Sequence, residues 1–179
     1  MQDRKRGATR RRAPGGVGAE IRQGRGFRSR AQEATVALLR TASVVGRALA
    51  RVVEPHGLSL AQYNALRIIR GAGSGGIPTL AVRERMIEEG TTITRIVDKL
   101  EAAGLIRRER SLPDRRQVIC HVTDKGRRLL DELDPKVDAA DEEAVAVLGP
   151  ARLERFVEML DLVRQANARR GAPRTAREA

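Results

Sequence analysis

The chain has 179 residues, with 35 lysines and arginines against 23 acidic residues, and a formal net charge of +12 at pH 7. Its single cysteine excludes an internal disulfide framework, and its cysteine and two histidines do not have the spacing of a structural zinc site, so we expect no metal and no cofactor. No apolar run approaches the ~18 residues of a membrane span, and the basic start is not followed by the apolar stretch of a secretory signal, so we expect a cytoplasmic protein without membrane contact.

The excess positive charge lies at the two ends of the chain. Residues 1–30 hold 10 basic and 2 acidic side chains, and residues 164–179 hold 5 and 1. By composition neither end buries enough apolar surface to fold alone, so we predict a disordered basic N-terminal tail and a basic C-terminal tail. The middle, 31–163, is balanced in charge and is predicted as one globular domain. Because the chain has only three aromatic residues, it lacks a stacking surface for single strands, which leaves duplex DNA as the natural anionic partner.

The first predicted helix covers residues 33–54. Its apolar and small residues recur at alternating steps of four and three: Leu38, Ala42, Val45, Leu49 and Val52. Such a narrow stripe is typical of a helix that packs on a partner helix. Pro55 and Gly57 then end the helix and favour a turn.

A second, short helix is predicted between Ser59 and Gly71. Ser59 and Gln62 have the spacing of a capping box. The apolar residues of this helix share one face: Tyr63, Leu66 and Ile69.

The run GAGSGG at 71–76 matches the G-x-G-x-x-G string of nucleotide-binding sites. That fingerprint requires a strand before it and a helix whose N-terminus meets the phosphates after it. Here a helix precedes the run, and Ile77 and Pro78 follow it. We therefore predict a flexible connection, and a nucleotide-binding enzyme is kept only as an alternative.

Two further helices are predicted around a turn at 88–90. Thr79 is the expected N-cap of the first, which covers the run LAVRERMI. The second, within 90–104, has an inward face at helical spacing: Ile93, Ile96, Val97 and Leu100. Its outward face is polar and comprises Thr91, Thr92, Thr94, Arg95, Asp98 and Lys99. Gly104 ends it.

Beyond Gly104 the apolar period changes to two. LIRRER, the turn SLPD and RRQVICHV predict a β-hairpin with a basic tip. Val118, Cys120 and Val122 share one face, so Cys120 is interpreted as a buried strand residue and not as a redox-active thiol. We interpret His56 and His121 as structural or solvent-facing.

Two long helices complete the domain. Thr123 is predicted to cap the first, and its inward residues are Leu130, Leu133, Val137, Ala140, Ala144 and Val147. Gly149 and Pro150 break the chain before the last helix, whose apolar residues are Leu153, Phe156, Val157, Leu160 and Val163. Residues 107–128 are mainly basic and residues 129–163 mainly acidic, which predicts one positive and one negative end.

Two short helices followed by a basic hairpin have the order of a winged helix-turn-helix. A helix fits the major groove, where its outward side chains reach base edges, and an arginine-bearing β-ribbon can lie along the backbone or in the minor groove. The threonines are short donors whose methyl groups suit thymine. Arg95 can contact guanine bidentately, and Lys99 is better placed for phosphate.

The segment TRIVDKLEAAGLIRRERSLPDRRQVICHVTDKG (94–126) resembles the recognition helix, wing and following helix of the MarR (multiple-antibiotic-resistance regulator) family of bacterial transcription factors. LAQYNALRII (60–69) and TLAVRERM (79–86) resemble the helices ahead of it. The LE, GL, DRR and VT elements together carry the resemblance, which covers roughly 33–165.

This resemblance implies a mainly α fold with a small β-hairpin (α+β), in which 33–54 and 124–165 form a helical dimerisation region and 59–123 bind DNA. It also implies a homodimer on pseudo-palindromic operators that a small molecule often releases. Asp114 and Arg116 match the family's D-x-R wing positions, where the aspartate helps to orient the arginine and the arginine reaches the minor groove. The reactive cysteine of the hydroperoxide-sensing branch is absent near the first helix.

We therefore predict a sequence-specific, DNA-binding transcriptional regulator and no enzyme: a homodimeric repressor relieved by a small-molecule effector. The predicted DNA-binding residues are Thr91, Thr92, Thr94, Arg95, Lys99, Arg110, Asp114, Arg115 and Arg116. The alternative is a non-specific architectural DNA-binding protein, whose binding through the basic ends would fall steeply with salt. No effector-binding residues are predicted, because core packing accounts better for the positions of Tyr63, Arg67 and Arg47 than a cleft does.

Overall fold

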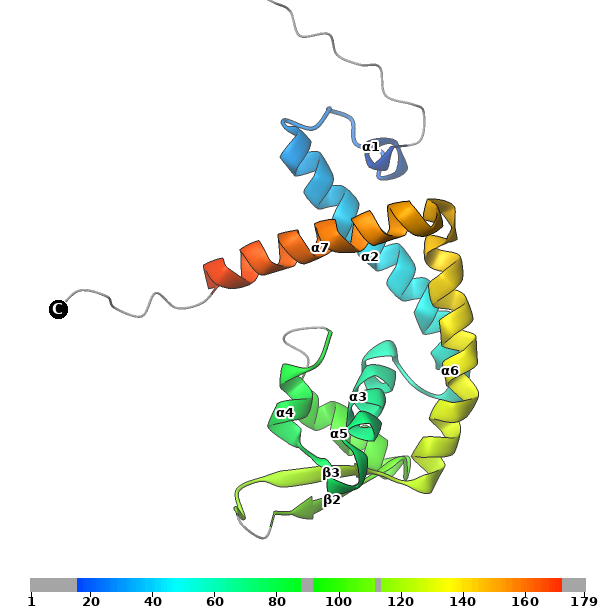
Figure 1. Ribbon diagram of the computed structural model, residues 1–179, viewed down its shortest axis with the longest axis vertical. Coiled ribbons are helices and arrows are strands. Elements are labelled where there is room, and N and C mark those ends of the chain that lie inside the picture. Colours follow the sequence, from blue (N-terminus) through cyan, green and yellow to red (C-terminus); the bar gives the residue numbers. More distant parts are fainter. Residues whose placement is uncertain (1–15, 88–91, 112–113, 172–179) are drawn as a thin grey trace, which may run out of the picture. The chain divides into compact units, whose positions relative to one another are not determined.

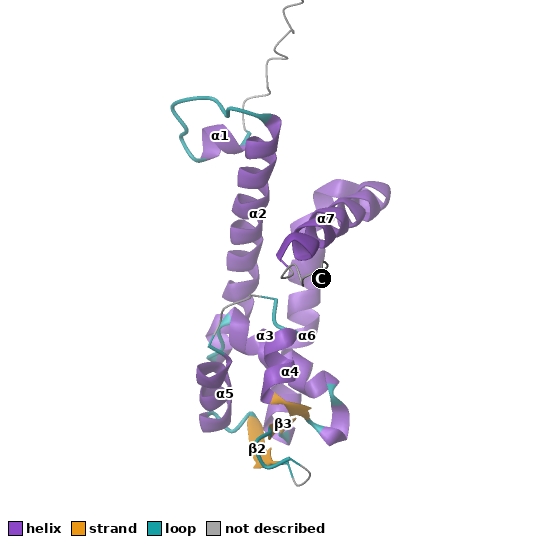
Figure 2. Cartoon of the chain, turned by 90° about the vertical axis from the view of Figure 1, so that its left-hand side faces the viewer, coloured by secondary structure: helices purple, strands orange, loops and turns teal. Residues whose placement is uncertain are grey.

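The computed structural model describes residues 16–87, 92–111 and 114–171, and side-chain surroundings as far as residue 168 (Figure 1). It is mostly helical, with one small three-stranded antiparallel sheet (Figure 2). The chain divides after Arg47 into two compact units, residues 1–47 and 48–179. Within the described residues, no helix has both the length and the apolar character that a membrane crossing demands.

The first unit contains α1 (Val17–Glu20) and most of α2 (Arg30–Val53). Arg40 on α2 pairs with Glu20 on α1, at 2.7 Å between guanidinium nitrogen and carboxylate oxygen. A Cβ on Gly18 would lie 3.1 Å from the Phe27 ring. These contacts hold a helical turn in a stretch that composition predicts to be disordered, while residues 1–15 of that tail lie outside the described part.

In the second unit, the sequence signals for α3 (Leu60–Gly71) are confirmed. The Ser59 hydroxyl accepts from the Gln62 backbone N–H at 3.2 Å, and the Gln62 side chain accepts from the Ser59 N–H at 2.8 Å. Tyr63, Leu66 and Ile69 are buried as predicted. Before α3, the 3₁₀ turn η1 (Glu54–His56) ends at Gly57, whose φ of +78° favours glycine.

The glycine-rich connection is more ordered than predicted. It forms the 3₁₀ turn η2 (Gly73–Gly75) and leads into the two-residue strand β1 (Ile77–Pro78), which pairs with β3 (Val118–Val122). Gly76 has a φ of +67°, and a Cβ there would lie 2.5 Å from the His121 ring. The expectation of a plain hairpin missed β1 because two residues show no period, and a proline fits only at a sheet edge.

Helix α4 (Thr79–Glu84) is shorter than predicted, and Thr79 does not cap it. The cap position belongs to Pro78, and the Thr79 hydroxyl donates instead to the Val118 carbonyl at 3.1 Å. Pairing of β1 with β3 brings Thr79 to that carbonyl, so tertiary contact overrides the local capping preference. The turn predicted at 88–90 lies outside the described residues.

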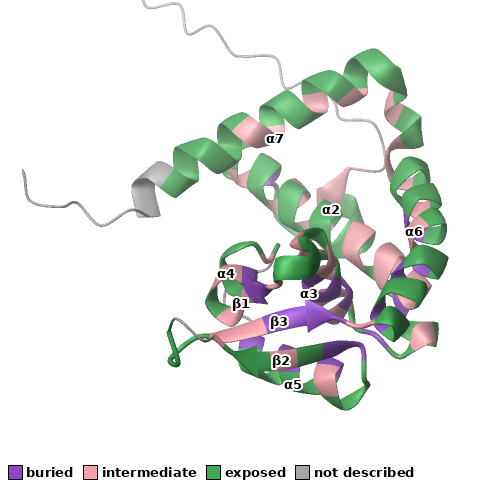
Figure 3. Cartoon of the chain, turned by 60° about the horizontal axis from the view of Figure 1, so that its bottom comes forward, coloured by how far each residue is buried: buried purple, intermediate pink, exposed green. Residues whose placement is uncertain are grey.

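Helix α5 (Ile93–Ala102) has the predicted inward face. Ile93, Ile96, Val97 and Leu100 are all buried. The wing follows as β2 (Ile106–Arg110) and β3, paired so that Ile106 faces Val122 and Arg110 faces Val118. Figure 3 shows the buried part of β3, which includes Cys120 and Val122.

Helix α6 (Asp124–Val145) begins at Thr123, whose hydroxyl accepts from the Gly126 N–H at 3.1 Å, as predicted. Leu130, Leu133 and Val137 are buried. The inward assignment of Val147 is wrong, since its side chain is 85% exposed. It lies in the 3₁₀ turn η3 (Ala146–Leu148), where three residues per turn break the helical spacing on which that assignment relied.

Helix α7 (Gly149–Gly171) extends into the predicted C-terminal tail. An ion pair between Arg164 and Asp161 and a hydrogen bond from the Asn167 amide to the Val163 carbonyl support its last turns. Local contacts of this kind extend a helix without a core of its own, which a composition argument does not detect. Residues 172–179 lie outside the described part.

Gly126 lies directly against the backbone of Leu105, so we expect Gly126→Ala to destabilise the fold. A Cβ at this position would lie 2.2 Å from the Leu105 carbonyl oxygen, which is backbone and cannot rotate away. Overpacking of this kind costs about 1–3 kcal/mol in free energy of unfolding, measurable by urea denaturation. Gly71→Ala is the control, because a Cβ there meets nothing within 4 Å. Equal stability of the two variants would contradict the packing argument.

Candidate nucleic-acid interface

Burial of one side of α5 leaves a polar face on the other. Thr94, Arg95 and Lys99 are exposed there. Thr92 is the exposed N-cap residue, and its side chain makes no capping hydrogen bond. Thr91, also predicted to contact DNA, lies outside the described residues. The helix thus presents short hydroxyl donors near its N-terminus and two cations farther along, the set that major-groove contact requires.

The wing tip is shaped by Asp114. Its carboxylate accepts from the Arg116 backbone N–H at 3.0 Å and from the Gln117 side-chain amide at 3.0 Å. The Gln117 N–H donates to the Asp114 carbonyl at 2.9 Å, which closes the turn. Asp114 therefore positions Arg116 through the backbone, and the Arg116 guanidinium stays exposed. The other predicted wing cations, Arg110 and Arg115, are exposed as well.

Six of the nine predicted residues line two hollows. Thr94, Asp114 and Arg116 line a cavity of about 570 Å³ between α4, α5 and the wing. Thr92, Arg95 and Lys99 line a second hollow of about 310 Å³ against the start of α3. Arg110 and Arg115 line neither. Helix α5 and the wing thus line one groove together, while Thr92, Arg95 and Lys99 line the hollow beside α3.

Arg108 is the residue that sequence reasoning missed. From β2 its guanidinium reaches the Asp98 carboxylate at 2.7 Å and the Glu101 carboxylate, with 2.8 Å from Nε, and its backbone N–H donates to Glu101 at 3.1 Å. The hydrogen bonds from Arg108 lower the pKa of Glu101. The hydrogen bonds to Glu101, and after them those to Asp98, raise the pKa of Arg108. This cluster, the Arg108 clasp, ties the wing to α5. In the period-two pattern Arg108 is one of several strand cations, and only the packing of β2 against α5 reveals the clasp.

His121 also has a partner that the sequence did not show. Its side chain is 9% exposed, and Nε2 lies 2.9 Å from a Glu109 carboxylate oxygen. Glu109 stands diagonally across the hairpin, since His121 itself faces Arg107 in the register. Arg107 and, to a lesser degree, His121 lower the pKa of Glu109. Of the two expectations for His121, solvent-facing or structural, the structure excludes the first, because the side chain is buried and paired with Glu109.

Cys120 is buried, as predicted from the alternation on β3. Its side chain is 0% exposed, and its sulfur lies 3.5 Å from the Thr79 hydroxyl. Burial raises the pKa of the thiol, which opposes the thiolate form that redox chemistry requires.

The Arg108 clasp should make stability depend on pH through Glu101. Because the folded-state pKa of Glu101 is lowered, its stabilising contribution is present above its ordinary pKa of 4.5 and is lost as the pH falls below that value. We expect the fall in Tm between pH 5 and about 3 to be smaller for Glu101→Gln than for the unmodified chain. Glu84→Gln is the control, because Glu84 is exposed and has no ion pair among the described residues. Identical pH profiles for all three proteins would rule out the contribution.

Comparison with known proteins places this geometry in a family. A family model described as transcriptional regulator SarA/Rot matches residues 49–133. The HTH-type transcriptional regulator MhqR of Bacillus subtilis is 31% identical over 111 residues, which cover 62% of this chain and 75% of MhqR. The residues that the family model matches include α3, α4, α5 and the β2–β3 wing, which carry the candidate interface.

Solved structures of MarR family regulators also match this chain. A MarR transcription factor from Planctomyces limnophilus is 31% identical, with a TM-score of 0.59 over 76% of this chain and 99% of that chain. Sco3205, a MarR family regulator from Streptomyces coelicolor in complex with DNA, shares the fold at 20% identity and a TM-score of 0.70, over 80% and 92% of the two chains. CouR from Rhodococcus jostii RHA1, bound to p-coumaroyl-CoA, shares it at 24% identity and a TM-score of 0.64, over 85% and 100%. With these relatives and a winged helix-turn-helix made of α4, α5 and the β2–β3 wing, the chain belongs to the MarR family of DNA-binding transcriptional regulators.

Proposed function

We propose that this protein is a homodimeric repressor that binds a pseudo-palindromic operator in the cytoplasm and is released by a small-molecule effector. The observation that carries the DNA-binding part is the exposed polar face of α5 beside an exposed cationic wing. Arg95 on the helix and Arg116 on the wing form no ion pair with any residue that the structure describes. Cations left exposed and unpaired on both elements are what a phosphate backbone and base edges require.

Each predicted contact has a role in this proposal. Two copies of α5 enter successive major grooves about one helical turn apart. Thr92 and Thr94 contact base edges, Arg95 contacts a guanine, and Lys99 contacts phosphate. Thr91 belongs to the same proposed set. Arg116 enters the minor groove, Asp114 positions it, and Arg110 and Arg115 neutralise the flanking backbone.

Apolar side chains left exposed on the long helices support the dimer. In the first unit α2 exposes Leu38, Leu39 and Val44, and Leu39 is 66% exposed. In the second unit α7 exposes Val157, Met159, Leu162 and Val163. Exposed apolar side chains gathered on one element mark interaction sites. Of the stripe predicted on residues 33–54, Leu38 is exposed, whereas Leu49 and Val52 pack against the core of this chain. The proposed partner of the exposed apolar side chains is a second copy of this chain.

A regulator is favoured over the enzyme alternative by the context of GAGSGG. The segment follows helix α3 and precedes a two-residue strand, which is the reverse of the strand–turn–helix order that places phosphates on a helix N-terminus. The effector part of the proposal is supported by CouR, which has the same fold and is bound to p-coumaroyl-CoA.

Footprinting tests the proposed function directly. The purified full chain is applied to the DNA flanking its own gene, with excess random competitor DNA present. We expect one protected, two-fold symmetric site, because two recognition helices contact two half-sites. Even protection along the fragment, seen only without competitor, would instead identify an architectural protein that binds through its basic ends.

Arg95→Ala should cost about 1–3 kcal/mol of operator binding and relax specificity at one base position. The reason is the loss of a bidentate contact to one base edge. Mobility-shift titrations on the operator and on its single-base variants measure both effects. An equal loss on every sequence would assign Arg95 to phosphate contact instead.

Arg116→Ala is the matching change on the wing. We expect weaker operator binding and a slope of log K against log salt that is smaller by roughly 1, since one cation no longer displaces counterions. Titrations at several salt concentrations give this slope. If neither the affinity nor the slope changes, the wing arginine does not touch DNA.

A further inference from the structure

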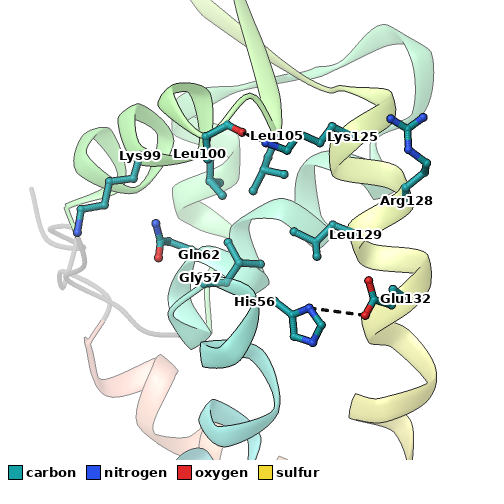
Figure 4. A pocket seen from close by; sticks show the side chains of 12 residues that line it. His56, Gly57, Gln62, Lys99, Leu100, Leu105, Lys125, Arg128, Leu129 and Glu132 are labelled. Carbon is teal, nitrogen blue, oxygen red and sulfur yellow. Dashed lines mark hydrogen bonds and ion pairs between the residues drawn. The ribbon is translucent and has the colours of Figure 1, made fainter.

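A cavity of about 680 Å³ lies beside α5, on the side of α6 (Figure 4). Its walls are the C-terminal turns of α5, the first half of α6 and the connection between α2 and α3. The volume is typical of small-molecule sites. Among the described residues assigned above to DNA contact, Lys99 alone lines it. The cavity shares Lys99 and Gln62 with the hollow against α3 and shares no lining residue with the groove between helix and wing.

The floor of the cavity is apolar. Leu58, Leu100 and Leu105 are 3%, 0% and 4% exposed, and Leu129 is partly buried. Figure 4 shows Leu100, Leu105 and Leu129 directed into the space between the helices. A floor of this kind covers the apolar part of a ligand.

The rim is cationic on two sides of this floor. Lys99 stands on α5, while Lys125 and Arg128 stand on α6 (Figure 4). Lys99 and Arg128 are exposed and form no ion pair with any residue in the described ranges. Lys125 donates one hydrogen bond to the Ala103 carbonyl at 2.8 Å, which leaves the other donors of its ammonium group available.

The carboxylate of Glu132 does not neutralise this rim. Lys136 binds it at 2.8 Å and lowers its pKa, and His56 lies 3.7 Å from the same oxygen. The charge of Glu132 is therefore already compensated by Lys136, whereas that of the rim is not.

We propose that this cavity binds an organic dianion, a molecule with an apolar middle and an anionic group at each end, and that such a ligand weakens operator binding. One anionic group meets Lys125 and Arg128, and the other meets Lys99 through charge-assisted hydrogen bonds. The regulatory half of the proposal rests on the proposed function, in which Lys99 contacts DNA phosphate. Ligand and DNA then compete for the same ammonium group, and each weakens the other by the same factor.

Calorimetry on the full chain tests the site without DNA. The probes are linear dicarboxylates from succinate to dodecanedioate, and each is compared with the monocarboxylate of the same length. We expect saturable binding that peaks at one length, and binding of the matching monocarboxylate that is weaker by about tenfold or more. No saturable binding, or equal binding of both series, would overturn the proposal.

Two neighbouring arginines on α6 provide matched variants. Arg128 lines the cavity, whereas Arg127 is also exposed, does not line it, and pairs with Asp124 at 3.5 Å. Arg128→Gln should weaken binding of the best dicarboxylate by about tenfold, and Arg127→Gln should leave it unchanged. Circular dichroism verifies that both variants are folded. Equal losses in the two would show non-specific charge attraction and overturn the site.

Operator titration with and without the best dicarboxylate separates the two proposals. We expect the ligand to lower the operator affinity of the unmodified chain and of Arg127→Gln, and to have less effect on Arg128→Gln. Normal operator binding that the bound ligand does not change would overturn the regulatory half and leave the DNA-binding function intact. Calorimetric binding in a chain that recognises no operator would support the site and contradict the proposed function.

Discussion

The candidate DNA-binding surface of this protein depends on the burial of one side of a ten-residue helix. The Val97 and Leu100 side chains of α5 are fully buried, and Ile93 and Ile96 nearly so. Burying a side chain of this size stabilises the fold by about 1.5–3 kcal/mol. Rotating α5 about its axis would expose this apolar set, so the helix has one energetically acceptable orientation. That orientation places Thr94, Arg95 and Lys99 toward solvent.

Burial fixes the face of α5 but not the position of the wing relative to it, which is where the Arg108 clasp acts. Asp98 and Glu101 stand on α5 about one turn apart, and one guanidinium from β2 binds both. The planar, five-donor head of arginine makes such double contact, which a lysine would not. Two carboxylates on the proposed DNA-binding helix would be unfavourable near phosphate, and Arg108 compensates their charge. The clasp thus joins the wing to the helix.

Periodicity and capping rules predicted the elements that local sequence determines. The capping box at Ser59, the Thr123 cap and the inward face of α5 depend on neighbours within a turn, and the structure confirms them. Features that depend on distant partners were missed. Strand β1 forms because it pairs with β3. The Thr79 hydroxyl donates to a carbonyl 39 residues away and does not cap α4, and Arg108 contacts its partners only where β2 packs against α5. The exposed polar face of α5 was predictable, whereas the clasp that positions the wing was not.

The charge division along the chain has a structural use. Arg70 on α3 reaches Asp131 at 3.3 Å and Asp134 at 2.7 Å on α6, so the acidic stretch of α6 binds the helix that supports α5. The basic start of α6 lies one turn away, at the cavity rim. Lys99 lines both this cavity and the hollow on the DNA side. Since α5 is only about 15 Å long, a ligand in the proposed site at its C-terminal turn would touch the same rigid element that is proposed to contact the bases, and no longer route is needed to couple the two proposed sites.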